Sequence, residues 1–255
     1  MRISPLKYIR TFWKLVQQRV DYKSIPIIII SFNQLYYLRE LVTFLLKHNY
    51  RNIIIIDNHS SYPPLLEYFN SIESKVKIIR LNKNYGHTVF WDNESLFKKY
   101  SSGYYVITDP DIVPVSDCPQ DFLKTFYCLL KENKNITKVG FSLKIDDIPE
   151  TNKNKPFIVQ WEKQFWENKE KNYYLAGIDT TFALYRPNYR KKEGFCDAIR
   201  VDYPYQAIHG GWYIDNDNLS EEQKFYMKHT SASSSWRVDD DGNLLNEEYK
   251  NYFNK

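Results

Sequence analysis

Residues 25–31 read Ile-Pro-Ile-Ile-Ile-Ile-Ser, and residues 52–57 read Asn-Ile-Ile-Ile-Ile-Asp. Each is a nearly continuous apolar run, which is typical of a β-strand that is buried on both faces. Residues 35–48 lie between them and place leucine and valine at helical spacing. A strand, a helix and a second strand in this order predict a parallel β-α-β unit.

The same alternation continues further along the chain. Residues 63–72 begin with two prolines, which suit the first turn of a helix. Residues 76–80 and 104–108 are predicted to be strands, with a helix at 89–100 between them. We therefore expect an α/β fold of the Rossmann-like kind, with a mostly parallel central sheet flanked by helices.

The last of these strands ends in Asp109-Pro110-Asp111. Side chains two residues apart on an extended backbone point the same way, so the two carboxylates lie side by side. Their mutual repulsion makes ionisation costly unless a cation lies next to them. Mg²⁺ and Mn²⁺ prefer oxygen ligands and often complete their shells with substrate phosphates. The motif favours a metal–diphosphate site, and the alternative is an acidic strand-to-loop turn.

Polar residues follow all four predicted strands. The clusters are Ser31–Asn33, Asp57–Ser60, Asn82–Gly86 and Asp109–Asp111. Ligands of parallel α/β sheets bind beyond the carboxyl ends of the strands. Because the clusters converge on that edge, the sequence favours a ligand site there over a set of unrelated turns.

The second half of the chain has a less regular pattern. Residues 123–131 are predicted to form a helix, and residues 139–143 and 180–185 to form strands. The Lys/Asn-rich residues 150–155 are expected to be an exposed loop. We expect this half to be a mixed C-terminal extension that shapes a second substrate site within one domain spanning 25–255.

Residues 1–24 are predicted to form a separate, basic amphipathic helix. Apolar residues recur at helical spacing along it, with Phe12 and Trp13 among them. Its basic side chains are opposed only by Asp21. Such a helix fits a membrane-surface anchor. The alternative is a helix packed on the domain with its basic face in water.

The composition is that of a globular protein with a high share of aromatic residues. Of 255 residues, 43% are apolar and 26% are charged, which allows a sizeable core. The aromatic share is 17%, and Tyr and Trp suit carbohydrate faces and membrane boundaries as well as cores. The net charge of +4 is too small to indicate nucleic-acid binding.

The sequence lacks the signatures of several other protein classes. Three cysteines without paired spacing indicate reduced thiols rather than disulfides or a zinc site. No segment has the length and apolarity of a transmembrane helix or a signal peptide. No G-x-G-x-x-G, P-loop, G-x-S-x-G or H-E-x-x-H motif is present. We expect a cytoplasmic protein at the inner face of the cell membrane.

Taken together, the strand-end clusters resemble those of the GT-A nucleotide-sugar glycosyltransferases, especially the broad family 2. The matching segments are I-I-I-I-S-F-N (27–33), I-I-I-I-D-N-H-S-S (53–61), N-K-N-Y-G (82–86) and the D-x-D motif (109–111). The second half matches more loosely, through residues 176–185 and 209–213. It has no Glu-Asp pair near residue 179, where the family often carries one.

The resemblance implies a set of residues that bind the nucleotide-sugar donor. They are Ser31, Phe32, Asn33, Asp57, Asn84, Gly86 and Asp109. Asp57 would accept hydrogen bonds from the base or the ribose, with a turn or helix-capping role as the alternative. Asn84 and Gly86 would let the backbone approach the nucleotide, with an ordinary turn as the alternative.

The resemblance also implies a Mn²⁺ or Mg²⁺ ion. Asp111 would bind it directly, and Asp109 would contact the ribose, or the metal through water. His209, which precedes two glycines, would complete the metal site, and His229 is the competing ligand. The ion would neutralise the diphosphate leaving group.

Asp179 is the residue that we expect to act as general base. It follows a glycine at the start of an apolar segment, where an acceptor hydroxyl can reach it. Removal of the hydroxyl proton permits in-line attack with inversion at the anomeric carbon. Asp146, Asp147 and Asp202 are the alternatives.

The function implied by the resemblance is transfer of a sugar from a nucleotide-sugar, most simply UDP-linked, to a hydroxyl of a glycan or lipid-linked glycan in bacterial surface-polysaccharide synthesis. Residues 25–115 would bind the nucleotide and residues 116–255 the acceptor. Two alternatives stay open, a sugar-nucleotide pyrophosphorylase and an inactive glycan-binding or scaffold subunit. The loop at 32–36 lacks the basic, glycine-rich character of a pyrophosphorylase, and the intact carboxylates argue against an inactive subunit.

Overall fold

The structure is a computed structural model that describes residues 5–190, 197–230, 238–239 and 244–245. The strands are β1 (Ile27–Ser31), β2 (Ile53–Asp57), β3 (Lys77–Arg80), β4 (Tyr105–Thr108), β5 (Ile112–Pro114), β6 (Lys138–Leu143), β7 (Tyr173–Leu175), β8 (Ala183–Tyr185) and β9 (Ala198–His209). The α-helices are α1 (Pro5–Val20), α2 (Tyr36–Lys47), α3 (Pro63–Ile72), α4 (Val89–Asp92), α5 (Glu94–Tyr100), α6 (Phe122–Glu132), α7 (Lys155–Lys163) and α8 (Glu221–His229). Short 3₁₀ helices are η1 (Tyr22–Ser24), η2 (Gln164–Trp166) and η3 (Gly210–Trp212).

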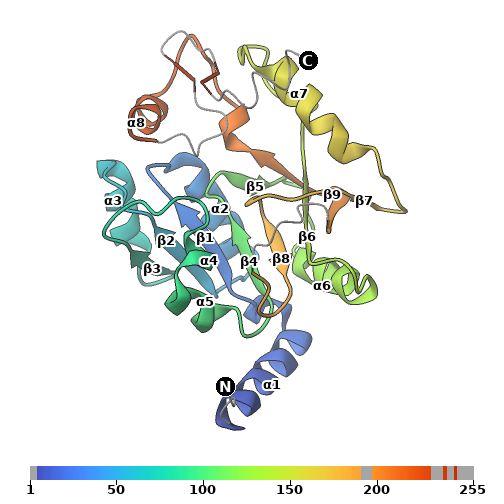
Figure 1. Cartoon of the computed structure of the whole chain (residues 1–255). Helices are drawn as coiled ribbons and strands as arrows, with labels where there is room; N and C mark the ends of the chain where they lie inside the picture. The colour runs from blue at the N-terminus through green and yellow to red at the C-terminus, as the bar shows by residue number, and fades with distance from the viewer. Residues whose placement is uncertain (1–4, 191–196, 231–237, 240–243, 246–255) are drawn as a thin grey trace.

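The described strands form one mixed sheet. Its order is β3-β2-β1-β4-β8-β6-β9-β5, and β7 pairs with β9 (Figure 1). Strands β1 to β4 are parallel to one another, whereas β8 joins β4 in the antiparallel direction. The predicted α/β class is confirmed, with a run of parallel strands, β1 to β4, followed by a mixed C-terminal part.

The isoleucine runs explain why helices cover both faces of this sheet. Ile27 and Ile29 pack with α2, α3 and α6, whereas Ile28 and Ile30 pack with α4 and α5. All four side chains are at most 5% exposed. Because burial of each is worth about 1.5–3 kcal/mol, both faces of β1 are held firmly, and the polar residues that follow it have fixed positions.

Several elements differ from the sequence prediction. The predicted helix at 89–100 is interrupted at Asn93, whose side chain caps α5 by accepting hydrogen bonds from the Ser95 and Leu96 amides, both at 3.1 Å. The segment 150–155 is not an exposed loop throughout, because Asn152 is 2% exposed and α7 begins at residue 155. The sequence analysis did not predict β5, β7, β9, α7 and α8, whose sequence patterns are short or irregular.

The N-terminal helix α1 turns a polar side toward the domain. Gln18 is 1% exposed and bonds both the amide and the carbonyl of Tyr104, at 2.9 and 2.8 Å. Lys14 donates to the Tyr100 carbonyl at 3.2 Å, and burial lowers the pKa of its ammonium. In the described part of the chain, no helix is long and apolar enough to span a membrane.

The cysteine prediction agrees with the described thiols. Cys118 is buried and Cys128 is exposed, and both are free. Cys196 lies outside the described residues.

Candidate active site

A cavity of about 750 Å³ lies beyond the carboxyl ends of β1, β2 and β4. Its walls come from the loops after those strands, from α7 and η2, and from α8. Seven of the residues predicted from the sequence line it, namely Phe32, Asn84, Gly86, Asp109, Asp111, Asp179 and His209. The strand-end clusters therefore do meet around one space.

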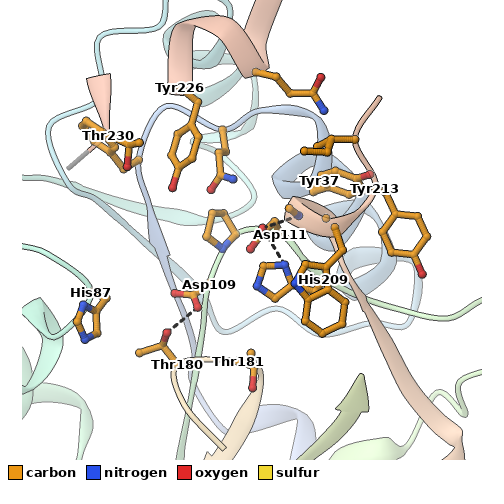
Figure 2. Close-up of a pocket in the computed structure, with 18 of the residues that line it drawn as sticks. Tyr37, His87, Asp109, Asp111, Thr180, Thr181, His209, Tyr213, Tyr226 and Thr230 are labelled. Carbon is orange, nitrogen blue, oxygen red and sulfur yellow. Dashed lines mark hydrogen bonds and ion pairs between the residues drawn. The ribbon is translucent and has the colours of Figure 1, made fainter. Parts of the chain in front are cut away.

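Asp111 and His209 lie together at the floor of the cavity (Figure 2). Strand β5 pairs with β9 so that Ile112 faces His209. This register places His209 Nδ1 3.5 Å from Asp111 Oδ2. The imidazole stacks on Trp212, with ring centroids 4.7 Å apart and planes 8° apart, which fixes its orientation.

The loop after His209 wraps around Asp111. The Gly210 amide donates to the Asp111 carbonyl at 2.7 Å, and the Gly211 amide donates to Asp111 Oδ2 at 3.1 Å. A Cβ atom on Gly210 would lie 2.2 Å from Cδ2 of Tyr37. A side chain at this position would displace the Tyr37 ring or the loop, so Gly210 allows the loop to lie close to both Tyr37 and Asp111.

Replacing Gly210 with alanine is expected to weaken Mn²⁺-dependent UDP binding at least about tenfold, because an overlap of this size forces either the loop or the Tyr37 ring, both beside Asp111, to move. Titration of UDP in the presence and absence of Mn²⁺ measures the effect. Gly211→Ala is the milder comparison, since its Cβ would meet the nearest atom, Cε1 of His209, at 3.1 Å. Equal, undiminished affinity in both variants would contradict this account of the loop.

The Asp111–His209 pair fits a divalent metal. His209 Nδ1 is buried and has no hydrogen-bond partner among the described residues, and a bound cation would satisfy both this nitrogen and the nearby carboxylate. Within residues 5–190 and 197–230 and the four described residues beyond, no group of three or more His, Cys, Asp or Glu side chains gathers around a metal position. Among the described residues, Asp111 and His209 are thus the two converging groups that could bind such an ion.

Asp109 is oriented by a different segment. Its Oδ2 accepts a hydrogen bond from Thr180 Oγ1 at 2.6 Å, and its amide donates to the Thr180 carbonyl at 3.1 Å. The adjacent Asp179 is exposed and lines the cavity. The sequence pattern drew attention to Asp179 but not to Thr180, although the Asp-Thr-Thr run stands in the segment that carried the resemblance.

The loop at residues 84–87 is held by Asn58, which the sequence analysis did not single out. The Asn58 side chain donates from Nδ2 to the Gly86 carbonyl at 3.0 Å, and its Oδ1 accepts from the Tyr85 backbone amide at 2.9 Å. Gly86 has φ +82°, a conformation that favours glycine. Asn84 accepts the Gly86 amide at 2.8 Å. Asn58 directly follows the predicted Asp57 in the sequence, and this position could have identified it as a residue of the site.

Three predicted donor residues lie behind the cavity wall. Asp57 is 0% exposed, and its carboxylate accepts the Ser60 amide at 2.9 Å and Arg80 Nε at 3.0 Å. Asn33 accepts the Ser61 and Tyr62 amides. Ser31 is buried next to β2. None of the three is among the described lining residues, and their contact with a donor stays a prediction.

The competing candidates from the sequence do not line the cavity. Asp146, Asp147 and Asp202 are absent from its described lining, and each pairs with a lysine. His229 ends α8, where its Nδ1 lies 2.8 Å from the Phe225 carbonyl. The geometry therefore favours Asp179 and His209 over these alternatives.

Helix α8 is a part of the site that the sequence analysis missed. Glu222 accepts the Leu35 amide at 2.8 Å and the Tyr36 amide at 3.1 Å, which ties α8 to the start of α2. Tyr226 and Thr230 face the cavity (Figure 2). The Ser220–Gln223 capping box at the start of α8 was the signal in the sequence.

Tyr37 forms another wall that the sequence pattern did not single out. Burial raises the pKa of its hydroxyl, and the neighbouring Tyr36, Asp111 and Glu222 raise it further. The phenol is therefore neutral and can act only as a neutral hydrogen-bonding group or a packing surface beside Asp111.

Comparison with known proteins identifies the family. The sequence pattern of the family described as glycosyl transferase family 2 matches residues 27–192, which is more than half of the chain. A search of curated proteins found no match.

Solved structures include similar proteins at low identity. The mannosyltransferase PcManGT from Pyrobaculum calidifontis, in complex with GDP-Man and Mn²⁺, is 11% identical, with 88% of this chain and 70% of that chain covered and a TM-score of 0.49. TarS 1-349 from S. aureus is 14% identical, with 88% and 68% covered and a TM-score of 0.43. On the family match, this chain belongs to glycosyl transferase family 2 and is a glycosyltransferase of the GT-A type.

Proposed function

We propose that this glycosyltransferase transfers a sugar from a nucleoside-diphosphate sugar, with UDP as the nucleotide, to a hydroxyl group of a carbohydrate acceptor in a metal-dependent, inverting reaction. The observation that carries the proposal is the Asp111–His209 pair, whose ligand atoms lie 3.5 Å apart at the floor of a 750 Å³ cavity. Asp179 lines the same cavity from another segment.

The donor is assigned to the half of the cavity formed by residues 25–115. Phe32 offers a flat apolar ring for the base, and the 84–87 loop offers backbone groups for the sugar and phosphates. Asp111 and His209 would hold Mn²⁺ or Mg²⁺, with substrate phosphates filling the remaining positions. When bound, the ion would supply positive charge against the negative charge that builds on the diphosphate leaving group.

The acceptor is assigned to the half of the cavity formed by residues 116–255. Its hydroxyl oxygen attacks the anomeric carbon as the bond to the diphosphate breaks, and Asp179 takes the hydroxyl proton. The products are the glycosylated acceptor and a nucleoside diphosphate. Attack on the face opposite the leaving group inverts the anomeric centre.

The experiment that tests the proposal is a thermal-shift and hydrolysis screen of UDP-, GDP- and CMP-sugars with and without Mn²⁺. Stabilisation by one nucleotide series only when Mn²⁺ is present supports it and identifies the donor. Absence of any response from folded protein contradicts it. Formation of a nucleoside triphosphate from a responding donor and pyrophosphate would identify pyrophosphorylase chemistry instead.

We also propose that α1 binds an anionic membrane surface. Helix α1 projects from one end of the molecule, opposite α8 (Figure 1). Its outward side exposes four large side chains, namely Tyr8 (72%), Ile9 (52%), Phe12 (55%) and Trp13 (64%). Arg10 and Arg19 are exposed on the same helix. Exposed aromatic and basic residues together fit a lipid surface at the cytoplasmic face, where a lipid-linked glycan of surface-polysaccharide synthesis would be the acceptor.

Replacing Phe12 and Trp13 with serine is expected to weaken binding to phosphatidylglycerol-rich vesicles by more than about tenfold, because loss of about 1.4 kcal/mol already gives that factor and each ring contributes on the order of 1.5 kcal/mol or more when buried. Cosedimentation with vesicles measures the change. Gln17→Ser, an exposed polar position of the same helix, should bind like the wild type. Equal binding by the serine variant would refute the membrane assignment.

A further inference from the structure

A buried ion pair forms part of the cavity wall on the side of α7. Glu162 Oε2 lies 2.8 Å from Arg200 Nη1, and both residues are 3% exposed although both line the cavity. The loss of solvation on burying two charges often exceeds their attraction. Stability is therefore a weak reason for placing such a pair here, and the mechanism proposed above uses neither residue.

The pair reaches the segment that carries Asp179. Arg200 Nε donates to the Gly177 carbonyl at 2.8 Å, and the guanidinium lies 3.9 Å from the centroid of the Phe165 ring. Glu162 holds another edge of the same planar guanidinium. Since a guanidinium presents its donors in a fixed fork, fixing it at Glu162 also fixes the Gly177 carbonyl.

A second buried cation supports the next residue of this segment. Lys138 donates to the Ile178 carbonyl through its ammonium group. Lys138 lies on β6 and Arg200 on β9, which are paired in parallel. Two basic side chains thus bond the two consecutive carbonyls that precede Asp179. The position of Asp179 therefore depends on Arg200 and Lys138.

The same segment also sets the orientation of Asp109. Thr180, next to Asp179, bonds Asp109 through both its hydroxyl and its carbonyl, at 2.6 and 3.1 Å. A shift of the 177–181 backbone would therefore move two carboxylates of the site at once. A misplacement of about 1 Å can cost roughly 100-fold in rate.

We propose that Glu162 and Arg200 are a positioning pair, which holds the 177–181 segment so that Asp179 and Asp109 keep the geometry required for transfer. The inference rests on the proposed function, because it takes Asp179 as the base. Burial raises the pKa of the Glu162 carboxyl, and the Arg200 guanidinium opposes this rise. The Arg200 guanidinium therefore favours the ionised form of Glu162, which accepts its hydrogen bond.

The test uses Glu162→Gln and Arg200→Lys, together with a Glu162→Gln/Arg200→Met double variant that removes both buried charges in case a single change prevents folding. Arg186→Lys is the matched control. Arg186 also holds backbone carbonyls, those of Ile136 and Leu130, both at 2.6 Å, but it is absent from the described cavity lining.

The first readout is kinetic. With the donor that responds in the nucleotide-sugar screen, the pair variants are expected to lower kcat by roughly 10–100-fold, a larger factor than any loss of affinity for UDP and Mn²⁺, because Asp109 moves with the segment whereas the Asp111–His209 pair is held by the glycine loop. Arg186→Lys is expected to lower Tm without changing kcat. A parallel fall of kcat, UDP affinity and Tm in the pair variants would show a merely structural role and overturn the proposal.

The second readout does not require activity. Amide hydrogen exchange in a peptide covering residues 176–181 is expected to speed up in the pair variants and to stay at the wild-type rate in Arg186→Lys. Unchanged exchange in the pair variants rejects the positioning role, whatever the donor. If the wild type is inactive but amide exchange is faster in the variants, the proposed reaction is rejected, whereas the finding that Glu162 and Arg200 hold the 177–181 segment stands.

Discussion

The Asp111→Ala variant is expected to lose Mn²⁺-dependent sugar transfer by about 10³-fold or more, since removal of the group that stabilises leaving-group charge removes a large part of the rate enhancement. Asp111 is 5% exposed, and its Oδ2 both accepts the Gly211 amide and faces His209. The variant leaves His209 as a single ligand. Donor turnover and Mn²⁺-dependent UDP binding measure the loss.

Asp146→Ala is the matched control for this change. Asp146 is also a carboxylate, but its side chain is 78% exposed and it is absent from the described cavity lining. Its loss is expected to leave turnover within about twofold, because an exposed ion pair contributes little. Metal-stimulated turnover that persists in folded Asp111→Ala protein would place the metal elsewhere.

The Asp179→Asn variant is expected to lower kcat by about 10²–10⁴-fold, the usual contribution of a general base, while UDP and Mn²⁺ bind as in the wild type. The amide keeps the size of the side chain but cannot accept the acceptor proton. Steady-state kinetics, with UDP titration alongside, separates this effect from a loss of donor binding.

A different pattern would reassign the base. If Asp179→Asn keeps its turnover, proton removal belongs to another carboxylate of the described lining. A product with retained anomeric configuration would contradict the inverting mechanism, and with it the role of Asp179 as the base of that mechanism. The stereochemistry of the product, determined by NMR, distinguishes these outcomes.

Much of the fold was predictable from local sequence. The isoleucine runs at 27–30 and 53–56 are apolar at every position, which fits only a strand covered on both faces. Helices α2 and α3 followed from periodicity and from the prolines at 63–64. The prediction was weaker beyond β4. Strands β5 and β7 are only three residues long and give too short a stretch for a periodic signal, and the twelve-residue β9 mixes buried and half-exposed positions without strict alternation.

The sequence alone determined the first four strands, the covering helices and the D-x-D motif at the edge of the sheet, because these depend on nearest-neighbour chemistry along the chain. Tertiary structure alone decided which distant groups meet there. The register of β5 against β9 brings Gly211 to Asp111 across 100 residues and His209 with it, and Arg200 reaches Glu162 across 38. Such pairings depend on strand register and on the hydrogen-bonding needs of buried polar groups. A local sequence pattern does not specify which distant residue will be the partner.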